Sequence, residues 1–142
     1  MSDKPLTARD YPVAETRPEQ VAGSRGKPLS SLTLDAVIGG DVDIEDLRIT
    51  PQALLQQAQI SRSVGRAALA ENFERAAEMT RLPQDEVMTI YELLRPGRAE
   101  SKDSLLDAAS RIRRDHDAQQ LADFLEEAAR FYELRGLFRK RY

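Results

Sequence analysis

The sequence predicts an all-α fold of about five amphipathic helices, preceded by an extended, proline-rich arm at the N-terminus. Apolar residues recur at i, i+3, i+4 and i+7 in several segments, the spacing that places them on one face of a helix. No segment shows sustained alternation of apolar and polar residues, and proline or glycine separates the apolar segments. For a chain of 142 residues we expect the arm, residues 1–32, and one helical domain, residues 33–142.

The arm is predicted from its proline content. Proline fixes φ and lacks an amide donor, so this stretch cannot continue a long helix or occupy a central strand. Composition fits two alternatives: an extended arm anchored by Tyr11, Val13 and Val21, or a disordered tail. Four of the seven prolines lie in the arm, together with two glycines: Pro5, Pro12, Pro18, Pro28, Gly23 and Gly26.

Two short helices should follow the arm. Thr33 can cap a helix from Leu34 to about Ile38, which Gly39 ends. A second turn is expected from Ile44 to Leu47, where acidic residues suit a helix N-terminus.

The first long helix should begin at Thr50, as N-cap, and Pro51, as first helical residue, and run to about Val64. Gly65 predicts a break before a second helix over residues 66–80, with Phe73 as its largest buried side chain. The expected apolar face of this second helix comprises Leu69, Phe73, Ala76 and Thr80.

Three further helices are predicted. One opens at Pro83 and ends before Pro96, and Ser101 should cap the next. The last should run over residues 118–135 and close at Gly136. Their apolar faces comprise Val87, Ile90, Tyr91 and Leu94; Leu105, Ala108, Ala109 and Ile112; and Leu121, Phe124, Leu125, Ala128 and Tyr132.

Composition excludes several classes of function. A net charge of −3 argues against a dedicated polyanion binder. The absence of cysteine removes disulfides and thiolate metal sites, and an intracellular compartment is the natural default. The first 30 residues contain no secretory signal pattern, and no apolar stretch reaches the ~20 residues of a membrane span, so we expect a cytoplasmic protein.

Two loops superficially resemble ligand sites. Residues 23–27, Gly-Ser-Arg-Gly-Lys, lack the upstream glycine and the following Ser or Thr of a phosphate-binding loop and are interpreted as a turn. Asp41, Asp43 and Glu45 have the spacing of calcium ligands, but Asp46 stands where that loop needs glycine. We interpret them as a solvated acidic loop.

Other polar residues also favour structural interpretations. His116, the single histidine, lies at a predicted helix junction and is expected to be exposed, the alternative being a ligand or general base. Glu74, Arg75 and Glu78 suggest a polar helix face, although Arg75 could pair with a partner's carboxylate. The C-terminal charges are graded to complement the helix dipole, although basic residues among aromatic ones also occur in nucleic-acid binders. These residues are Arg130, Phe131, Tyr132, Arg135, Phe138, Arg139, Lys140, Arg141 and Tyr142.

Several longer motifs resemble a known family. They are Tyr11-Pro12, Asp46-Leu47-Arg48-Ile49-Thr50-Pro51, Asn72-Phe73-Glu74-Arg75-Ala76-Ala77-Glu78-Met79-Thr80, Ile90-Tyr91 and Leu94-Arg95-Pro96-Gly97-Arg98. Together they resemble the small (gamma) subunit of adenosylcobalamin-dependent diol and glycerol dehydratases, from about Tyr11 to the C-terminus.

The resemblance implies a function that the residues alone do not. In this family the large (alpha) subunit carries the active site in a barrel, and adenosylcobalamin lies between the large and medium (beta) subunits. The enzyme converts a 1,2-diol or glycerol to an aldehyde with loss of water. This chain would be a structural subunit with no catalytic, cofactor-binding or metal-binding residues, packed on the large subunit in a dimer of heterotrimers.

The resemblance also implies which residues meet a partner. The expected interface residues are Tyr11, Pro12, Leu47, Arg48, Thr50, Phe73, Glu74, Arg75 and Arg95, each of which could instead serve internal packing. Some relatives carry a longer N-terminal extension associated with packaging into bacterial microcompartments, whereas ten residues precede Tyr11 here, which leaves packaging open. The competing interpretation is a free-standing helical interaction module, or a nucleic-acid-binding regulator that uses the basic C-terminus.

Overall fold

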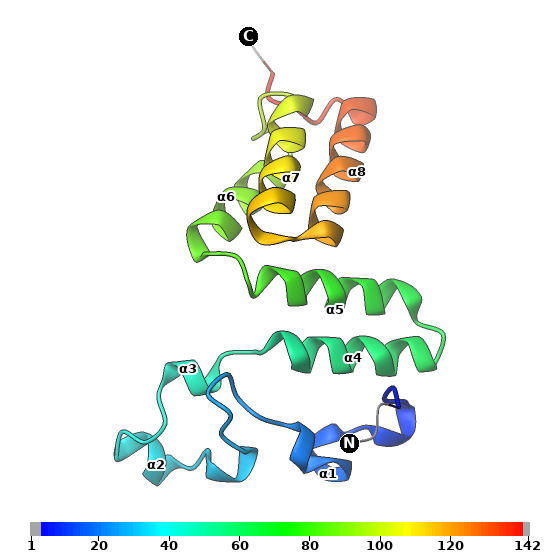
Figure 1. The fold of residues 1–142 in the computed structure, drawn as a ribbon. Helices are drawn as coiled ribbons and strands as arrows, with labels where there is room; N and C mark the ends of the chain where they lie inside the picture. Colours follow the sequence, from blue (N-terminus) through cyan, green and yellow to red (C-terminus); the bar gives the residue numbers. More distant parts are fainter. Residues whose placement is uncertain (1–3, 141–142) are drawn as a thin grey trace. The chain divides into compact units, whose positions relative to one another are not determined.

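The described part of the chain, residues 4–140 of a computed structural model, is helical and contains no strand (Figure 1). An isolated bridge between Ala22 and Pro28 is its one β-type pairing. The predicted all-α class is therefore confirmed. The chain divides into two compact units, one up to Ala77 and one from Glu78. No helix in the described residues is long and apolar enough to cross a membrane.

Residues 4–32 form a series of short helical turns and are not extended throughout as predicted. They comprise η1 (Ala8–Asp10), α1 (Val13–Thr16), η2 (Pro18–Gln20) and η3 (Leu29–Ser31). Three of the four prolines in this segment stand where a missing amide donor costs nothing: Pro12 and Pro28 are N-caps and Pro18 is the first residue of η2. Several one-turn helices therefore form where a long helix cannot.

This N-terminal segment is hydrogen-bonded to α4 (Pro51–Ser63). Leu6 donates its amide to Gln59 Oε1 at 2.9 Å, and Ala8 donates to Ser63 Oγ at 2.9 Å. Gln56 Nε2 donates to the carbonyl of Gln20 at 3.1 Å. A small apolar cluster formed by Leu6, Val13 and Ile60, with Val21 against it, accompanies these bonds. A domain division at residue 32 stays a prediction.

The first unit continues through α2 (Leu34–Ile38), α3 (Ile44–Leu47), α4 and α5 (Ala67–Met79). All four lie where the sequence predicts them, to within one or two residues. Thr33 caps α2 through a bond from Ala36, and Thr50 caps α4 through a bond from Ala53, each at N3. Figure 1 shows α4 and α5 antiparallel after the turn at Gly65.

The predicted apolar face of α5 is wrong at two of its four residues. Leu69 and Thr80 are exposed and Phe73 is half-buried, whereas Ala70 and Ala77 are fully covered. The two covered positions are related as i and i+7, so they lie on one side of the helix, and Leu69 lies outside that side.

The second unit consists of α6 (Gln84–Leu94), α7 (Lys102–His116) and α8 (Gln119–Arg135). The core between them includes most predicted face residues, although Tyr91 and Phe124 are exposed. Gly136 closes α8 in the left-handed region, as predicted. Ser101 precedes α7 at the predicted position, but its side chain makes no cap hydrogen bond. The predicted helix start is therefore correct, and the predicted capping bond is wrong. The buried residues of this core are Leu82, Ile90, Ala99, Leu105, Ala108, Ala109, Ile112, Ala118, Leu121, Ala122, Leu125 and Ala129.

Candidate interaction surface

Three of the predicted interface residues present apolar or ring surface to solvent. Tyr11 and Pro12 are exposed, at the start of α1, and are joined by a cis peptide bond. Leu47, the last residue of α3, is also exposed. The structure thus leaves these side chains accessible to a partner.

Arg48 and Thr50 have partners within the chain. Arg48 Nε lies 3.2 Å from Oε1 of Glu45, which is three residues earlier and also exposed. The sequence analysis assigned Arg48 to the interface and did not identify this pair. The hydroxyl of Thr50 accepts the amide of Ala53 at 3.1 Å, so its direct role is to cap α4.

The remaining four predicted residues are divided between the two units. Glu74 accepts hydrogen bonds from Arg62 at 2.7 and 2.8 Å, which ties α5 to α4. Arg75 donates to Asn72, one turn earlier on the same helix. Phe73 is half-buried in α5, and in the second unit Arg95 pairs with Glu92 at 2.9 Å.

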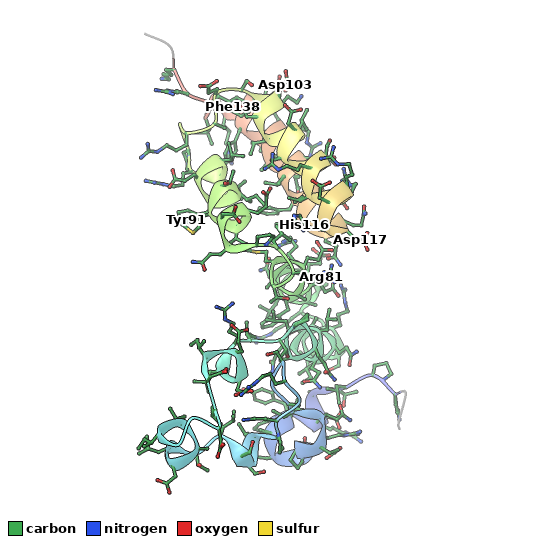
Figure 2. The ribbon with its side chains drawn as sticks, turned by 60° about the vertical axis from the view of Figure 1, so that its left-hand side comes forward. Arg81, Tyr91, Asp103, His116, Asp117 and Phe138 are labelled. Carbon is green, nitrogen blue, oxygen red and sulfur yellow. The ribbon has the colours of Figure 1, made fainter. Side chains whose placement is uncertain are left out.

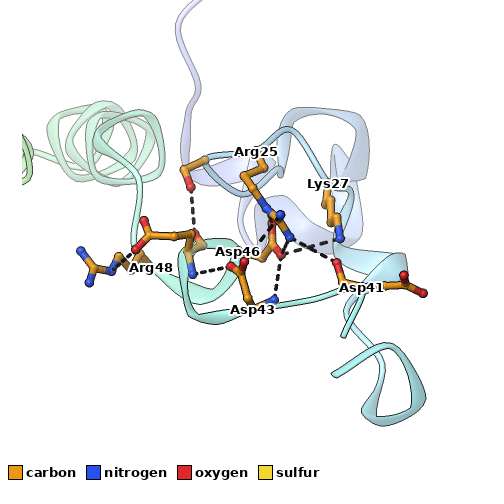
Figure 3. Close-up of polar contacts among 8 residues, drawn as sticks. Arg25, Lys27, Asp41, Asp43, Asp46 and Arg48 are labelled. Atoms are coloured by element: carbon orange, nitrogen blue, oxygen red, sulfur yellow. Dashed lines mark hydrogen bonds and ion pairs between the residues drawn. The ribbon is translucent and has the colours of Figure 1, made fainter. Parts of the chain in front are cut away.

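A polar anchor lies beside α3 and was not predicted. Asp46 is only 3% exposed, and Arg25 donates to both of its carboxylate oxygens, with Nε 2.7 Å from Oδ1 (Figure 3). Lys27 Nζ approaches the same carboxylate to 3.7 Å, and the amide of Asp43 donates to it at 3.0 Å. Hydrogen bonding from Arg25 holds the pKa of Asp46 far below its ordinary value, so the carboxylate stays ionised.

Gly23 allows the turn of residues 23–27 to lie against α3. A Cβ at this position would fall 2.8 Å from the carbonyl oxygen of Asp46, closer than any side chain tolerates. Ser24 Oγ donates to the carbonyl of Glu45 at 2.8 Å in the same contact. The turn and the acidic loop, two motifs that the sequence analysis treated separately, therefore form one structure.

Asp46 is the exception to the predicted solvated loop. Asp41, Asp43 and Glu45 are exposed, as expected, and no group of acidic or histidine side chains in residues 4–140 is arranged to hold a metal ion. Asp46 is buried because it closes a capping box with Asp43 at the start of α3 and neutralises Arg25. A buried carboxylate needs such partners, and a basic residue in the preceding turn was the available signal.

Large apolar side chains are exposed on α2, on α3 and at Ile49, just before α4. Of these the sequence analysis selected Leu47 alone. The available signal was the i, i+3, i+4 spacing on a helix of five residues, too short to bury an apolar face by itself. The side chains are Leu34, Val37, Ile38, Ile44, Leu47 and Ile49.

Glu78 provides a second unpredicted anchor. Its carboxylate is buried and accepts the amides of Gln120 at 3.0 Å and Leu121 at 2.7 Å. These amides open α8, whose N-cap residue, Ala118, has no side chain able to accept them. Glu78 therefore caps α8 from a distant part of the chain, whereas the sequence analysis assigned it to a polar helix face.

His116 is the last residue of α7 and is half-buried, not exposed as predicted. It lies at the turn between α7 and α8, next to Asp117, which adopts a left-handed conformation (Figure 2). A hydrogen bond from Arg114 lowers the pKa of the neighbouring Asp115.

The basic C-terminus has internal contacts in its described part. Arg130 lies 4.9 Å from the centroid of the Phe131 ring, and the amide of Arg139 donates to Ala99 at 2.8 Å. Phe138 packs on Tyr132 near the N-terminal end of α7, opposite His116 (Figure 2). The predicted contributions of Arg141 and Tyr142 lie outside the described residues.

Three hollows lie on the surfaces of the two units. One of about 470 Å³ is lined by Arg17, Asp10 and Ser63 among others, and Arg17 is already paired with Asp10 at 2.8 Å. A second, of about 780 Å³, follows residues 135–140, and a third, of about 410 Å³, lies over Leu94, Phe124 and Phe131. All three are wide open to solvent.

Comparison with known proteins decides the family. A family model described as the dehydratase small subunit matches residues 6–139, nearly all of the described chain. The chain belongs to the dehydratase small subunit family. Two named relatives, the propanediol dehydratase small subunits of Citrobacter freundii and Salmonella typhimurium, are each 43% identical over 123 residues. The match covers 87% of this chain and 71% and 70% of the two relatives.

Membership of the dehydratase small subunit family confirms the predicted resemblance. The chain is a subunit of a dehydratase, a lyase, and therefore belongs to an assembly with other subunits. The comparisons favour this interpretation over the free-standing interaction module and the nucleic-acid-binding regulator.

Proposed function

We propose that this chain is the small, structural subunit of an adenosylcobalamin-dependent dehydratase that converts propane-1,2-diol or glycerol to an aldehyde with loss of water. The family match over residues 6–139, together with the names of both relatives, carries the proposal. Propane-1,2-diol is the first substrate to test, because both relatives are named for propanediol.

The partners proposed are a large subunit that carries the active site and a medium subunit, in a dimer of heterotrimers. The proposal is supported by how this chain uses its charged groups. Its ionised side chains stabilise its own fold in pairs such as Arg25 with Asp46 and Arg62 with Glu74. These pairs hold helices and turns in position, the role expected of a structural subunit.

Adenosylcobalamin is proposed to bind to the other subunits. The donor set of the described residues does not fit this cofactor: His116, the single histidine, closes α7 and lines none of the three hollows described above. We therefore assign no step of the reaction to a residue of this chain.

The proposed interface retains all nine predicted residues. Tyr11, Pro12 and Leu47 would contribute directly, because their rings and side chains are exposed. Thr50 would contribute by fixing the start of α4. Phe73, Glu74 and Arg75 would act through the surface of α5, and Arg48 and Arg95 as exposed cations whose present partners are neighbours in sequence.

Reconstitution tests the proposed function. The purified chain is incubated with adenosylcobalamin and propane-1,2-diol or glycerol, alone and with separately expressed large and medium subunits. Aldehyde should form only in the complete mixture. Turnover by this chain alone would overturn the structural role, and a complete mixture inactive on both substrates would overturn the proposed substrate class.

A further inference from the structure

The segment of residues 34–49 exposes an unusual amount of apolar surface for its length. Leu34 is 73% exposed and Ile38 is 75% exposed. We call the six exposed side chains of this segment the apolar face; they are Leu34, Val37, Ile38, Ile44, Leu47 and Ile49. Single exposed apolar residues are ordinary, but a concentration of them marks an interaction site.

Helical spacing groups members of the apolar face. Leu34, Val37 and Ile38 are related as i, i+3 and i+4, so they lie on one side of α2, and Ile44 and Leu47 are similarly related on α3. An apolar side of a helix normally faces the core of its own domain. Here it faces solvent.

The segment is nevertheless held in place. Val42, between α2 and α3, is 3% exposed, and Asp46 is buried beneath Arg25. The side chains of Val42 and Asp46 are buried, while those of the apolar face are exposed. Exposure of this face is therefore a consequence of how the segment folds. Figure 3 shows Arg25 and Lys27 reaching Asp46 from the preceding turn.

Charge around the apolar face is mainly acidic. Residues 34–47 contain no lysine or arginine, and Asp35, Asp41, Asp43 and Glu45 are exposed among the apolar side chains. Arg25 pairs with Asp46 and lies 3.5 Å from Asp43, and Glu45 pairs with Arg48 at the end of the segment. Asp35 and Asp41 form no ion pair among the described residues, so they remain to meet a partner. A surface that complements this segment is therefore apolar and flanked by lysine or arginine.

We propose that the apolar face is the docking site for the large dehydratase subunit, which presents an apolar surface flanked by basic side chains. This inference rests on the proposed function and adds the location of the contact. It selects one segment of the first unit over the exposed apolar residues elsewhere in the chain.

The test compares matched serine variants of the tagged chain, co-expressed with the large and medium subunits. Leu34→Ser/Ile38→Ser removes two members of the apolar face, and Leu134→Ser is the control, because Leu134 is 74% exposed on α8. The double variant should retain the large subunit about tenfold less well or worse, the scale of losing interface hot-spot residues, and the control should match wild type. Circular dichroism of each isolated chain checks that the fold is unchanged.

A charge variant provides a test that does not depend on removing apolar side chains. Asp35→Lys/Asp41→Lys reverses two exposed charges without changing the apolar face. It should also weaken retention of the large subunit, most strongly at low salt, where charges are least screened.

The outcomes separate this inference from the proposed function. If wild type retains no large subunit, the proposed function fails. If wild type retains it and Leu34→Ser/Ile38→Ser retains it equally, or Leu134→Ser loses it as much, the docking site is wrong and the proposed function stands. If the isolated wild-type chain dimerises and the double variant does not, a second copy occupies the face and the docking inference is overturned.

Discussion

Arg25 binds the buried carboxylate of Asp46 through two nitrogen atoms and so fastens the turn of residues 23–27 to α3. The two residues lie 21 positions apart, and neither belongs to a motif that suggests a pair. This contact fixes the segment that carries the apolar face.

Removing Arg25 should destabilise the chain more than removing an exposed arginine. Arg25→Ala leaves Asp46 buried without its main partner, and an uncompensated buried charge is costly. Arg48→Ala removes an exposed ion pair with Glu45, which contributes little. Thermal unfolding of the isolated chain should show a clear fall in Tm for Arg25→Ala and almost none for Arg48→Ala. An equal fall in Tm for the two variants would show that the Arg25–Asp46 pair stabilises the chain no more than an exposed ion pair does.

Acid should weaken the fold through Asp46. The pKa of this carboxyl is lowered in the folded chain by hydrogen bonding from Arg25, against an ordinary value of 3.8. Its contribution is therefore fully present above pH 3.8 and is lost as the pH falls from there through the folded pKa. Asp10 and Asp115, whose pKa values are also lowered, act in the same direction.

Denaturant unfolding at a series of pH values measures this dependence. The free energy of unfolding of wild type should decrease as the pH falls below about 4. Asp46→Asn should be less stable at neutral pH and show a shallower decrease. Parallel curves for the two proteins would mean that Asp46 does not contribute to acid sensitivity.

The caps of α4 and α7 should differ in strength. Thr50 accepts the amide of Ala53, so Thr50→Ala should lower the free energy of unfolding by about 0.5–2 kcal/mol. Ser101 holds the equivalent position before α7 without a side-chain cap bond, so Ser101→Ala should have almost no effect. Urea titration distinguishes the two variants. An equal loss in free energy of unfolding for Ser101→Ala and Thr50→Ala would contradict this difference between the two caps.

Glu78 should protect the first turn of α8 from solvent exchange. Glu78→Gln keeps the size of the side chain and removes one of the two carboxylate oxygens that accept the amides of Gln120 and Leu121. Hydrogen exchange at these two amides should accelerate about fivefold or more, since one charge-assisted bond is lost. Amides in the middle of α8 serve as the internal control. Unchanged exchange would assign the capping of α8 to another group.

Arg48 should matter more to assembly than to the stability of the isolated chain. Arg48→Ala should reduce co-purification of the large subunit more than Thr50→Ala does, while the helix content of the isolated chain stays nearly unchanged. The reason is that Arg48, the cation of this otherwise acidic segment, is exposed and would pair with a carboxylate of the large subunit, whereas Thr50 acts within α4. A lower Tm of the isolated Arg48→Ala chain with intact assembly would make Arg48 an internal structural residue.

The helices could be predicted from sequence because their ends carry local signals. Thr33, Thr50 with Pro51, and Gly136 mark boundaries that the structure confirms within one or two residues. These signals act through bonds or dihedral angles within one helical turn, so no distant part of the chain decides them. Ser101 marked a boundary correctly although it makes no cap bond, because the hydroxyl is one of several ways to satisfy the first amides.

Distant contacts could not be predicted in the same way. The Arg25–Asp46 pair and the capping of α8 by Glu78 join residues 21 and 42–43 positions apart, and only the fold brings them together. The burial of α5 was misjudged because Ala70 and Ala77 take the inside positions that larger residues usually occupy. The turns of residues 4–32 were missed because the prolines of this segment were interpreted as helix breakers, although Pro18 starts a helical turn as Pro51 starts α4.

The central claim is that this chain is an assembly subunit of a dehydratase, and native mass spectrometry tests it most directly. The tagged chain is co-expressed with the large and medium subunits, and the complex is purified through the tag. We predict one assembly that contains all three chains in equal numbers, two copies of each. Recovery of this chain as a free monomer, while the large and medium subunits form a fully active enzyme without it, would contradict the claim.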